Sequence, residues 1–340
     1  MSFLARPRRL LMLSAVAGVL SVAGCGSAAD DRDVTAPSVE ASTATEPVDV
    51  TPSSTSTTQP APVVPAAVPF QPLADEVAVE AKQVAADLVV AAGTYDAGAG
   101  TVEGAMERIQ AIGGDPMIAD AMGNLLLPDA SASVEIVYPQ LGGLTETQAS
   151  IILVIRQHLA DSSGRREVTR TLDVRVASTG DRWGVEQVAS DGGSPPIDPP
   201  PPSEAAQAAL ADPRLTFPDT ARWDIEAGRV DDRVLVALVD AAAQSPLTVT
   251  TMTEGHPLEV FGTQRTSNHT EGRAVDIWAV GGTPVIALRD DASAARRVVD
   301  RLFASGVEEL GSPWDLDGAG ASRSFTNTVH QDHIHLAFDR

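Results

Sequence analysis

The chain has 340 residues, 43% of them hydrophobic, and a formal net charge of −22. A surface this acidic repels nucleic acid and anionic lipid headgroups, so neither is an expected partner. The length leaves room for two modest domains with cores of their own.

The N-terminus has the features of an export signal. A basic start precedes the apolar run from Leu10 to Val22, which ends in Val22-Ala23-Gly24-Cys25. This order predicts a signal peptide over residues 1–24, because the run is shorter than the roughly twenty apolar residues of a membrane-spanning helix. Val-Ala-Gly-Cys resembles the bacterial lipobox, which implies acylation of Cys25 and an extracytoplasmic protein anchored to the membrane by lipid. The alternative is an ordinary signal peptide with a chance cysteine.

Two segments of biased composition divide the rest of the chain. Residues 25–69 are rich in Thr, Ser, Pro and Ala, so they bury too little apolar surface to fold and are predicted to form a disordered tether. Residues 192–202 are rich in Pro and Gly and predict a semi-rigid linker. Folded units are therefore expected over residues 70–191 and 203–340.

The first unit is predicted to begin with helices and to end with strands. Apolar residues at three- and four-residue spacing from Val77 to Leu88 predict a helix that stops near Gly93, and shorter helical pieces follow near 102–112 and 116–126. Alternating patterns then predict long antiparallel strands, the last containing Trp183. This order resembles the α+β cone of nuclear transport factor 2-like domains. The sequence leaves open whether this unit binds a ligand, positions the other unit or packs against it.

The second unit mixes helices with strands. Its apolar spacing predicts two helices and three strands, and therefore an α+β fold. The helices are expected over 234–242 and 291–304, and the strands over 247–252, 307–310 and 329–338.

Two segments of this unit carry metal-binding residue types. Ser267–Asp276 reads SNHTEGRAVD and His330–His335 reads HQDHIH, so three of the six histidines lie in the last eleven residues. In an extended strand His333 and His335 share one face, as do Ala274, Asp276 and Trp278. Gly272 permits a tight bend that brings His269 back toward Asp276.

We expect His269, Asp276 and His335 to bind Zn²⁺, with His333 facing a water molecule at the fourth position. Two imidazoles and a carboxylate suit zinc, and an open fourth position is typical of a catalytic centre.

The spacing Ser-x-His-x-x-Gly-x-Ala-x-Asp followed by His-x-His resembles the D-alanyl-D-alanine metallopeptidases, which share the hedgehog fold. The resemblance covers about residues 203–340 and implies that His269, Asp276 and His335 are the zinc ligands. In the murein endopeptidases of this superfamily the penultimate His lies beside the metal, which corresponds to His333, and His330 also matches a His of that group. Other members carry a Glu where this chain has Asp332.

The resemblance implies hydrolysis of a peptide bond by a water molecule whose pKa the zinc lowers to about 7. Either His333, Asp332 or His330 would act as the general base. Arg265 is a candidate for binding a substrate carboxylate or a developing oxyanion, with an ordinary surface arginine as the alternative. Ser267 is a candidate for orienting a ligand, and His256 is expected to be a solvated turn residue.

The sequence thus predicts a membrane-anchored zinc peptidase that acts on peptidoglycan peptides, either as a carboxypeptidase or as an endopeptidase that cuts cross-links. The main alternative is a noncatalytic zinc-bearing module that binds wall peptides or a protein partner. In a third interpretation the first unit carries the main function. The sequence indicates nothing about the oligomeric state.

Overall fold

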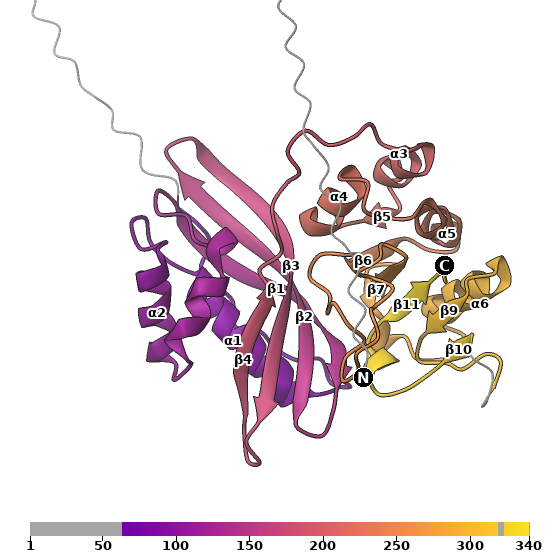
Figure 1. Ribbon diagram of the computed structural model, residues 1–340, viewed down its shortest axis with the longest axis horizontal. Helices are drawn as coiled ribbons and strands as arrows, with labels where there is room; N and C mark the ends of the chain where they lie inside the picture. The colour runs from indigo at the N-terminus through magenta and orange to yellow at the C-terminus, as the bar shows by residue number, and fades with distance from the viewer. Residues whose placement is uncertain (1–62, 319–322, 340) are drawn as a thin grey trace, which may run out of the picture. The chain divides into compact units, whose positions relative to one another are not determined.

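Two β-sheets, each with its own helices, form the part of the chain described by this computed structural model, residues 63–318 and 323–339 (Figure 1). The predicted signal peptide, Cys25 and nearly all of the predicted tether lie outside these residues. Within the described ranges, no helix combines the length and apolar character needed to cross a membrane. The prediction of an α+β fold is confirmed.

The first sheet is an antiparallel meander in the order β1-β2-β3-β4. Two helices precede it, with two short 3₁₀ turns after them. The bounds are α1 Val79–Gly93, α2 Val102–Ala111, 3₁₀ turns Pro116–Ala121 and Gly123–Leu125, β1 Ser131–Leu144, β2 Gln148–Asp161, β3 Gly164–Ser178 and β4 Trp183–Ser190. Helix α1 ends at Gly93, where the sequence predicts its stop.

The two faces of the first sheet are buried against different partners. On one face Ile151, Leu153 and Leu172 pack against Ala85 and Leu88 of helix α1 in one hydrophobic core. The opposite face carries a row of buried side chains that includes Tyr138, Gln140, Ile152, Val154 and Thr171, which the strand register places next to one another. Because strand residues alternate between faces, β1 presents Tyr138 and Gln140 to the second half of the protein.

The second sheet has the order β10-β9-β11-β7-β6-β5, with β8 paired to β7. Strands β7 and β11 are antiparallel neighbours near its centre. The elements in chain order are α3 Glu204–Ala211, β5 Leu215–Thr216, α4 Asp219–Glu226, α5 Asp232–Ala242, β6 Leu247–Thr251, β7 Ala274–Val280, β8 Thr283–Pro284, α6 Ala294–Ser305, β9 Glu309–Gly311, β10 Ser324–Phe325 and β11 Ile334–Ala337, with 3₁₀ turns at Val285–Ala287 and Val329–Gln331.

One face of this sheet packs against its helices. Val275 and Ile277 of β7 and Ile334 and Leu336 of β11 join a core with residues of α5 and α6 such as Leu238. The alternate residues of both strands, among them Asp276 and His335, therefore lie on the other face.

The two sheets meet through buried contacts. The ring of Tyr138 stacks on the ring of Trp278, with centroids 4.8 Å apart. The Thr171 hydroxyl donates a hydrogen bond of 2.6 Å to the backbone carbonyl of Thr250. The face of the first sheet that α1 leaves free thus packs against the face of the second sheet that carries Asp276.

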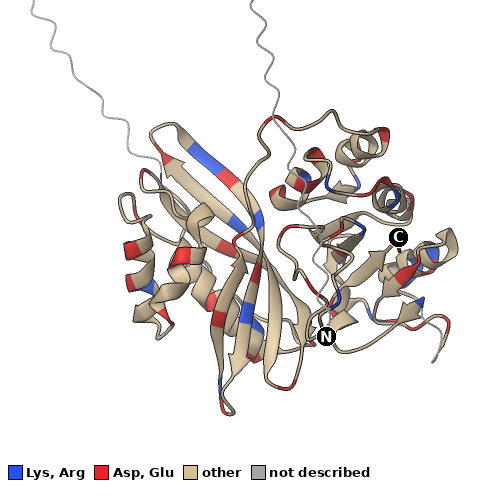
Figure 2. Cartoon of the chain, in the orientation of Figure 1, with Lys and Arg blue, Asp and Glu red and all other residues tan. Residues whose placement is uncertain are grey.

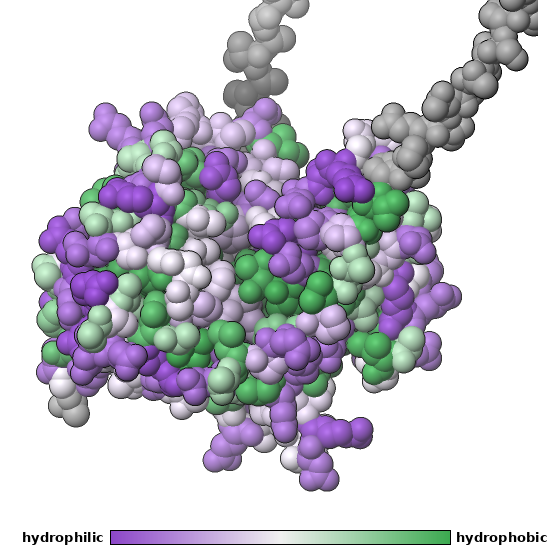
Figure 3. All heavy atoms as spheres, turned by 180° about the vertical axis from the view of Figure 1, so that it is seen from behind, coloured by the Kyte–Doolittle hydropathy of each residue, from purple (hydrophilic) through white to green (hydrophobic). Residues whose placement is uncertain are grey.

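The surface agrees with the composition. Acidic residues lie along both halves of the described chain (Figure 2). On the face drawn in Figure 3, hydrophobic residues form several small groups that are separated by hydrophilic ones.

The prediction of one strand over residues 329–338 is wrong at its start. Val329–Gln331 form a 3₁₀ turn, and β11 begins only at Ile334. Asn327 explains the turn, because its side-chain oxygen accepts hydrogen bonds from the backbone N–H groups of Val329 and His330. Such a local side-chain cap competes with strand pairing.

Candidate metal centre

Asp276 and His335 face each other across the two neighbouring strands β7 and β11. They are direct register partners in this antiparallel pair. Their side chains therefore project from the same face, at the short separation typical of cross-strand partners. His335 Nδ1 lies 2.9 Å from Asp276 Oδ1.

His269 reaches the same point from the loop before β7. Its backbone carbonyl accepts a hydrogen bond from Gly272 N–H at 2.9 Å, which closes a tight turn. Its ring Nδ1–H donates to the Met252 carbonyl, so the lone pair on Nε2 is directed at the other two side chains. His269 Nε2 lies 3.2 Å from Asp276 Oδ1 and 3.2 Å from His335 Nδ1.

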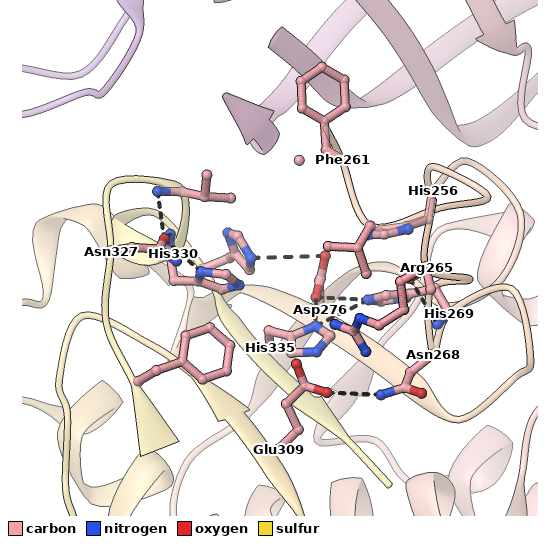
Figure 4. A pocket seen from close by; sticks show the side chains of 16 residues that line it. His256, Phe261, Arg265, Asn268, His269, Asp276, Glu309, Asn327, His330 and His335 are labelled. Carbon is pink, nitrogen blue, oxygen red and sulfur yellow. Dashed lines mark hydrogen bonds and ion pairs between the residues drawn. The ribbon is translucent and has the colours of Figure 1, made fainter. Parts of the chain in front are cut away.

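The three residues that the sequence predicts as ligands are therefore brought together, as Figure 4 shows. A hydrogen bond from ring N–H to a backbone carbonyl is a common way of orienting a metal-ligating histidine. Ser267, the predicted orienting residue, instead contacts the backbone N–H of His269 through its hydroxyl.

His256 is a fourth member of the group. Its ring stacks on His269 with centroids 3.8 Å apart and an angle of 14°. His256, His269 and Asp276 offer one ligand atom each within 4.8 Å of one another, so this group could hold a metal ion. The sequence predicts a solvated turn residue at His256, whereas the ring lines the cavity of the centre. Its Nδ1–H donates to the Pro257 carbonyl at 2.9 Å, which leaves Nε2 unprotonated.

Gly272 has a conformation that only glycine adopts readily. Its φ is +72°, and a Cβ atom there would lie 1.9 Å from the Arg229 carbonyl oxygen. We expect Gly272→Ala to lower the free energy of unfolding by roughly 2–4 kcal/mol, because both left-handed strain and a backbone clash must be relieved. Gly282 is a matched control, with φ +77° and no atom within 4 Å of the point where a Cβ would lie. Gly282→Ala should cost only the strain, about 1–2 kcal/mol, in the same urea unfolding measurement. Equal losses in both variants would contradict the clash.

His333 stands beside the three predicted ligands. Its Nε2 lies 4.0 Å from Asp276 Oδ2. Its Nδ1 lies 2.7 Å from Asp332 Oδ1, so the carboxylate accepts the Nδ1–H and leaves Nε2 as the nitrogen that faces the cavity. This arrangement fixes both the tautomer and the orientation of the imidazole.

Asp332 itself is turned away from the cavity. Its Oδ2 accepts hydrogen bonds from the Lys82 ammonium at 2.6 Å and from the Leu141 backbone N–H at 2.9 Å. Lys82 also pairs with Glu76, and all three side chains are fully buried. Burial opposes ionisation of Asp332, but the Lys82 charge and the His333 hydrogen bond outweigh it and lower the pKa of this carboxyl. Burial raises the pKa of Glu76.

His330 enters the cavity from the 3₁₀ turn. Its ring centroid lies 4.9 Å from that of His333 and 5.8 Å from that of His335, and its Nδ1–H donates to Asn327 Oδ1 at 2.8 Å. Strict strand alternation would direct this ring away from the site, but the turn reverses its direction. Burial, followed by the nearby His333 and His335, holds the pKa of His330 well below its ordinary value, so the ring is neutral.

The surroundings of Asp276, His335 and His256 shift their pKa values. Burial alone would raise the pKa of Asp276, but the neighbouring His269 and His333 hold it well below its usual value. Burial lowers the pKa of His335, but its hydrogen bond to Asp276 and the charge of that carboxylate outweigh burial and raise it. Burial and the adjacent His269 hold the pKa of His256 far below normal. The centre therefore contains a carboxylate anion among buried imidazoles.

The group opens into a cavity of about 210 Å³. Arg265, Phe261 and Glu309 line its walls together with the histidines (Figure 4). The sequence predicts Arg265 as a site residue but gives no signal for Glu309, whose carboxylate accepts a hydrogen bond of 2.9 Å from Asn268. A lone Glu at the start of a short strand carries no recognisable motif.

No family model, curated protein or solved structure is significantly similar to this chain.

Proposed function

We propose that the protein is a zinc-dependent peptidase and that His269, Asp276 and His335 hold the zinc. The observation that carries this proposal is the convergence of His269 Nε2, Asp276 Oδ1 and His335 Nδ1, which lie 2.9–3.2 Å from one another at the wall of a cavity. Ligand atoms at 2.0–2.2 Å from a tetrahedral ion are about 3.3–3.6 Å apart, so small side-chain shifts would accommodate it. Between His256 and His335 as the third ligand we favour His335, because its Nδ1 lies 2.9 Å from Asp276 Oδ1 and 3.2 Å from His269 Nε2.

A bound Zn²⁺ would supply a Lewis acid and an acidified water molecule. The protein's own part in the reaction is proton transfer. His333 Nε2 faces the cavity and would accept a proton from the attacking water and later donate it to the leaving amine. Asp332 would act as a positioning residue, because its carboxylate holds Nδ1–H of His333 and stabilises the cationic ring. Arg265 lines the cavity and would bind a carboxylate or oxyanion of the substrate.

The motif pair supports a substrate class. Its resemblance to D-alanyl-D-alanine metallopeptidases favours peptidoglycan stem peptides, trimmed by a carboxypeptidase or cut at a cross-link by an endopeptidase. The same resemblance favours the hedgehog-like fold for residues 203–340, and element order favours a nuclear transport factor 2-like cone for residues 70–191. The predicted signal peptide and Cys25 favour an activity at the outer side of the cell membrane, on a lipid anchor.

The test combines metal analysis with defined substrates. We expect the purified full-length chain to bind about one Zn²⁺ and to cleave muropeptides, and a chelator should abolish cleavage that added Zn²⁺ restores. Mass spectrometry of the products separates loss of a terminal residue from cleavage of a cross-link. His269→Ala should lose both zinc and activity, whereas His158→Ala, which changes a ring paired with Glu167 on the first sheet, should lose neither.

Stoichiometric zinc without cleavage of any muropeptide would contradict the peptidase and favour a zinc-bearing binding module. Absence of zinc from the folded chain would contradict the metal centre itself.

A further inference from the structure

The first sheet contacts the proposed ligand Asp276 through the side-chain amide of Gln140. Gln140 lies on β1, and its Nε2 donates a hydrogen bond of 2.6 Å to Asp276 Oδ2. Both side chains are buried, with exposed fractions of 0% for Gln140 and 1% for Asp276. The two residues are 136 positions apart in the sequence.

From this contact we propose that Gln140 is a positioning residue for the metal ligand Asp276, so that residues 70–191 are a working part of the site and not an appended module. The inference rests on the proposed function, because it assigns Gln140 a role at that same centre. It goes beyond the ligand set by naming a residue of the other sheet that controls metal affinity.

The two oxygens of Asp276 have different partners. Oδ1 faces His269 Nε2 and His335 Nδ1, whereas Oδ2 is held by Gln140. With Oδ2 engaged, the carboxylate presents one oxygen to an ion at Oδ1, and its plane is fixed by the amide. Partners of this kind orient metal-binding carboxylates, and their removal typically weakens metal binding 10–100-fold.

A purely structural role accounts poorly for an amide at this position. Among the described residues, the Gln140 side chain makes its hydrogen bond to Asp276 and its Oε1 has no partner. A buried amide that is only half satisfied costs free energy, whereas an apolar side chain of similar size would fill the same space without that cost. Among the described residues, the hydrogen bond of the Gln140 amide therefore goes to the proposed ligand Asp276.

The test measures zinc affinity in the full-length chain by competition with a chelator of known affinity. Gln140→Leu should bind Zn²⁺ about 10–100-fold more weakly than the unchanged chain. The visible absorption bands of the Co²⁺-loaded protein should also shift, because the geometry of the Asp276 ligand changes. Thermal unfolding of the metal-free proteins checks that Gln140→Leu still folds cooperatively, although the loss of the donor to a buried carboxylate oxygen should lower its stability.

Gln157 provides a matched control on the same sheet. It is buried to a similar extent, and its Nε2 donates to the Leu125 carbonyl at 2.7 Å, on the side away from the centre. Gln157→Leu should keep zinc affinity within about twofold and leave the Co²⁺ bands unchanged, because no proposed ligand loses a partner. Gln140→Met and Gln157→Met form a second pair in case leucine does not pack.

The outcomes separate the two proposals. If the unchanged chain binds zinc and Gln140→Leu binds it equally well, the role of Gln140 is overturned while the peptidase proposal stands. If the unchanged chain binds neither Zn²⁺ nor Co²⁺, both are overturned. Unfolding of both Gln140 variants, under conditions where both Gln157 variants stay folded, would assign Gln140 to structure and also overturn the inference.

Discussion

Replacing His333 with alanine is expected to lower kcat by about 10²–10⁴-fold, the range typical of a lost general acid–base group, while about one zinc per chain is retained. The reason lies in the geometry of its ring. Nε2 of His333 faces the cavity 4.0 Å from Asp276 Oδ2, but it does not belong to the group of three atoms that lie 2.9–3.2 Å apart. Zinc analysis and muropeptide turnover on the same preparation measure both effects.

His335→Ala is the informative comparison for this variant. His335 lies two residues further along the chain, and its Nδ1 contacts both His269 and Asp276. We expect this variant to lose zinc and activity together. Loss of zinc in His333→Ala would make His333 a ligand, and full activity with zinc retained would exclude it as the general base. His330→Ala then tests the remaining candidate, whose neutral ring also lines the cavity.

The placement of the proposed ligands was predictable because it depends on local rules. Alternation along a strand places Asp276 on the opposite face from Val275 and Ile277, and the structure has the latter two in the core. A glycine three residues after His269 predicts the bend that brings its ring back. The sequence alone does not give the register, and it is the direct pairing of Asp276 with His335 that brings the two segments together.

Contacts between the two sheets were beyond prediction for a physical reason. Periodicity reports which face of an element is buried, but it does not report what covers that face. Gln140 reads as an ordinary position of a long strand, and its partner Asp276 lies 136 residues later. The same limit applies to His256, whose ring packs on His269 from a turn that the sequence marks as polar.

The position of Lys82 in the sequence gives a usable indication of a buried ion pair. It is the only lysine of the chain, and it stands among apolar residues of α1 that face the core, such as Ala85 and Val89. A charged side chain on the buried face of a helix is rare unless it is paired. The sequence therefore indicates that a buried anion lies nearby, although it does not identify Asp332, 250 positions away, as that anion.

Lys82 links the fold of the first unit to the proposed base. Its ammonium lies between Glu76 and Asp332, and Asp332 in turn accepts the Nδ1–H of His333. In the series Lys82, Asp332 and His333, the buried carboxylate accepts the ring N–H of the imidazole and thereby orients it. Because every member before His333 is fully buried, removal of the cation cannot be compensated by solvent.

Lys82→Met is therefore expected to have the largest effect on stability. It leaves two carboxylates buried without their cation, and breaking a buried ion pair from one side typically costs about 3–5 kcal/mol. Urea unfolding of the metal-free protein measures this loss. Muropeptide turnover should also fall. Without the lysine cation, Asp332 is expected to bind a proton, and the protonated side chain no longer holds the His333 ring as it does in the unchanged chain.

A triple variant separates the loss of stability from the loss of activity. Lys82→Met combined with Glu76→Gln and Asp332→Asn removes all three charges while keeping similar volumes, and replacing a whole buried charge cluster is often close to neutral for stability. We expect this variant to recover most of the lost free energy of unfolding and yet to remain far less active, because the anion behind His333 is gone. Recovery of activity together with stability would mean that Asp332 does not support His333 through its charge. In that case Lys82 would contribute only to the packing of the two sheets. The residues around His333 would then fix only the position of its ring.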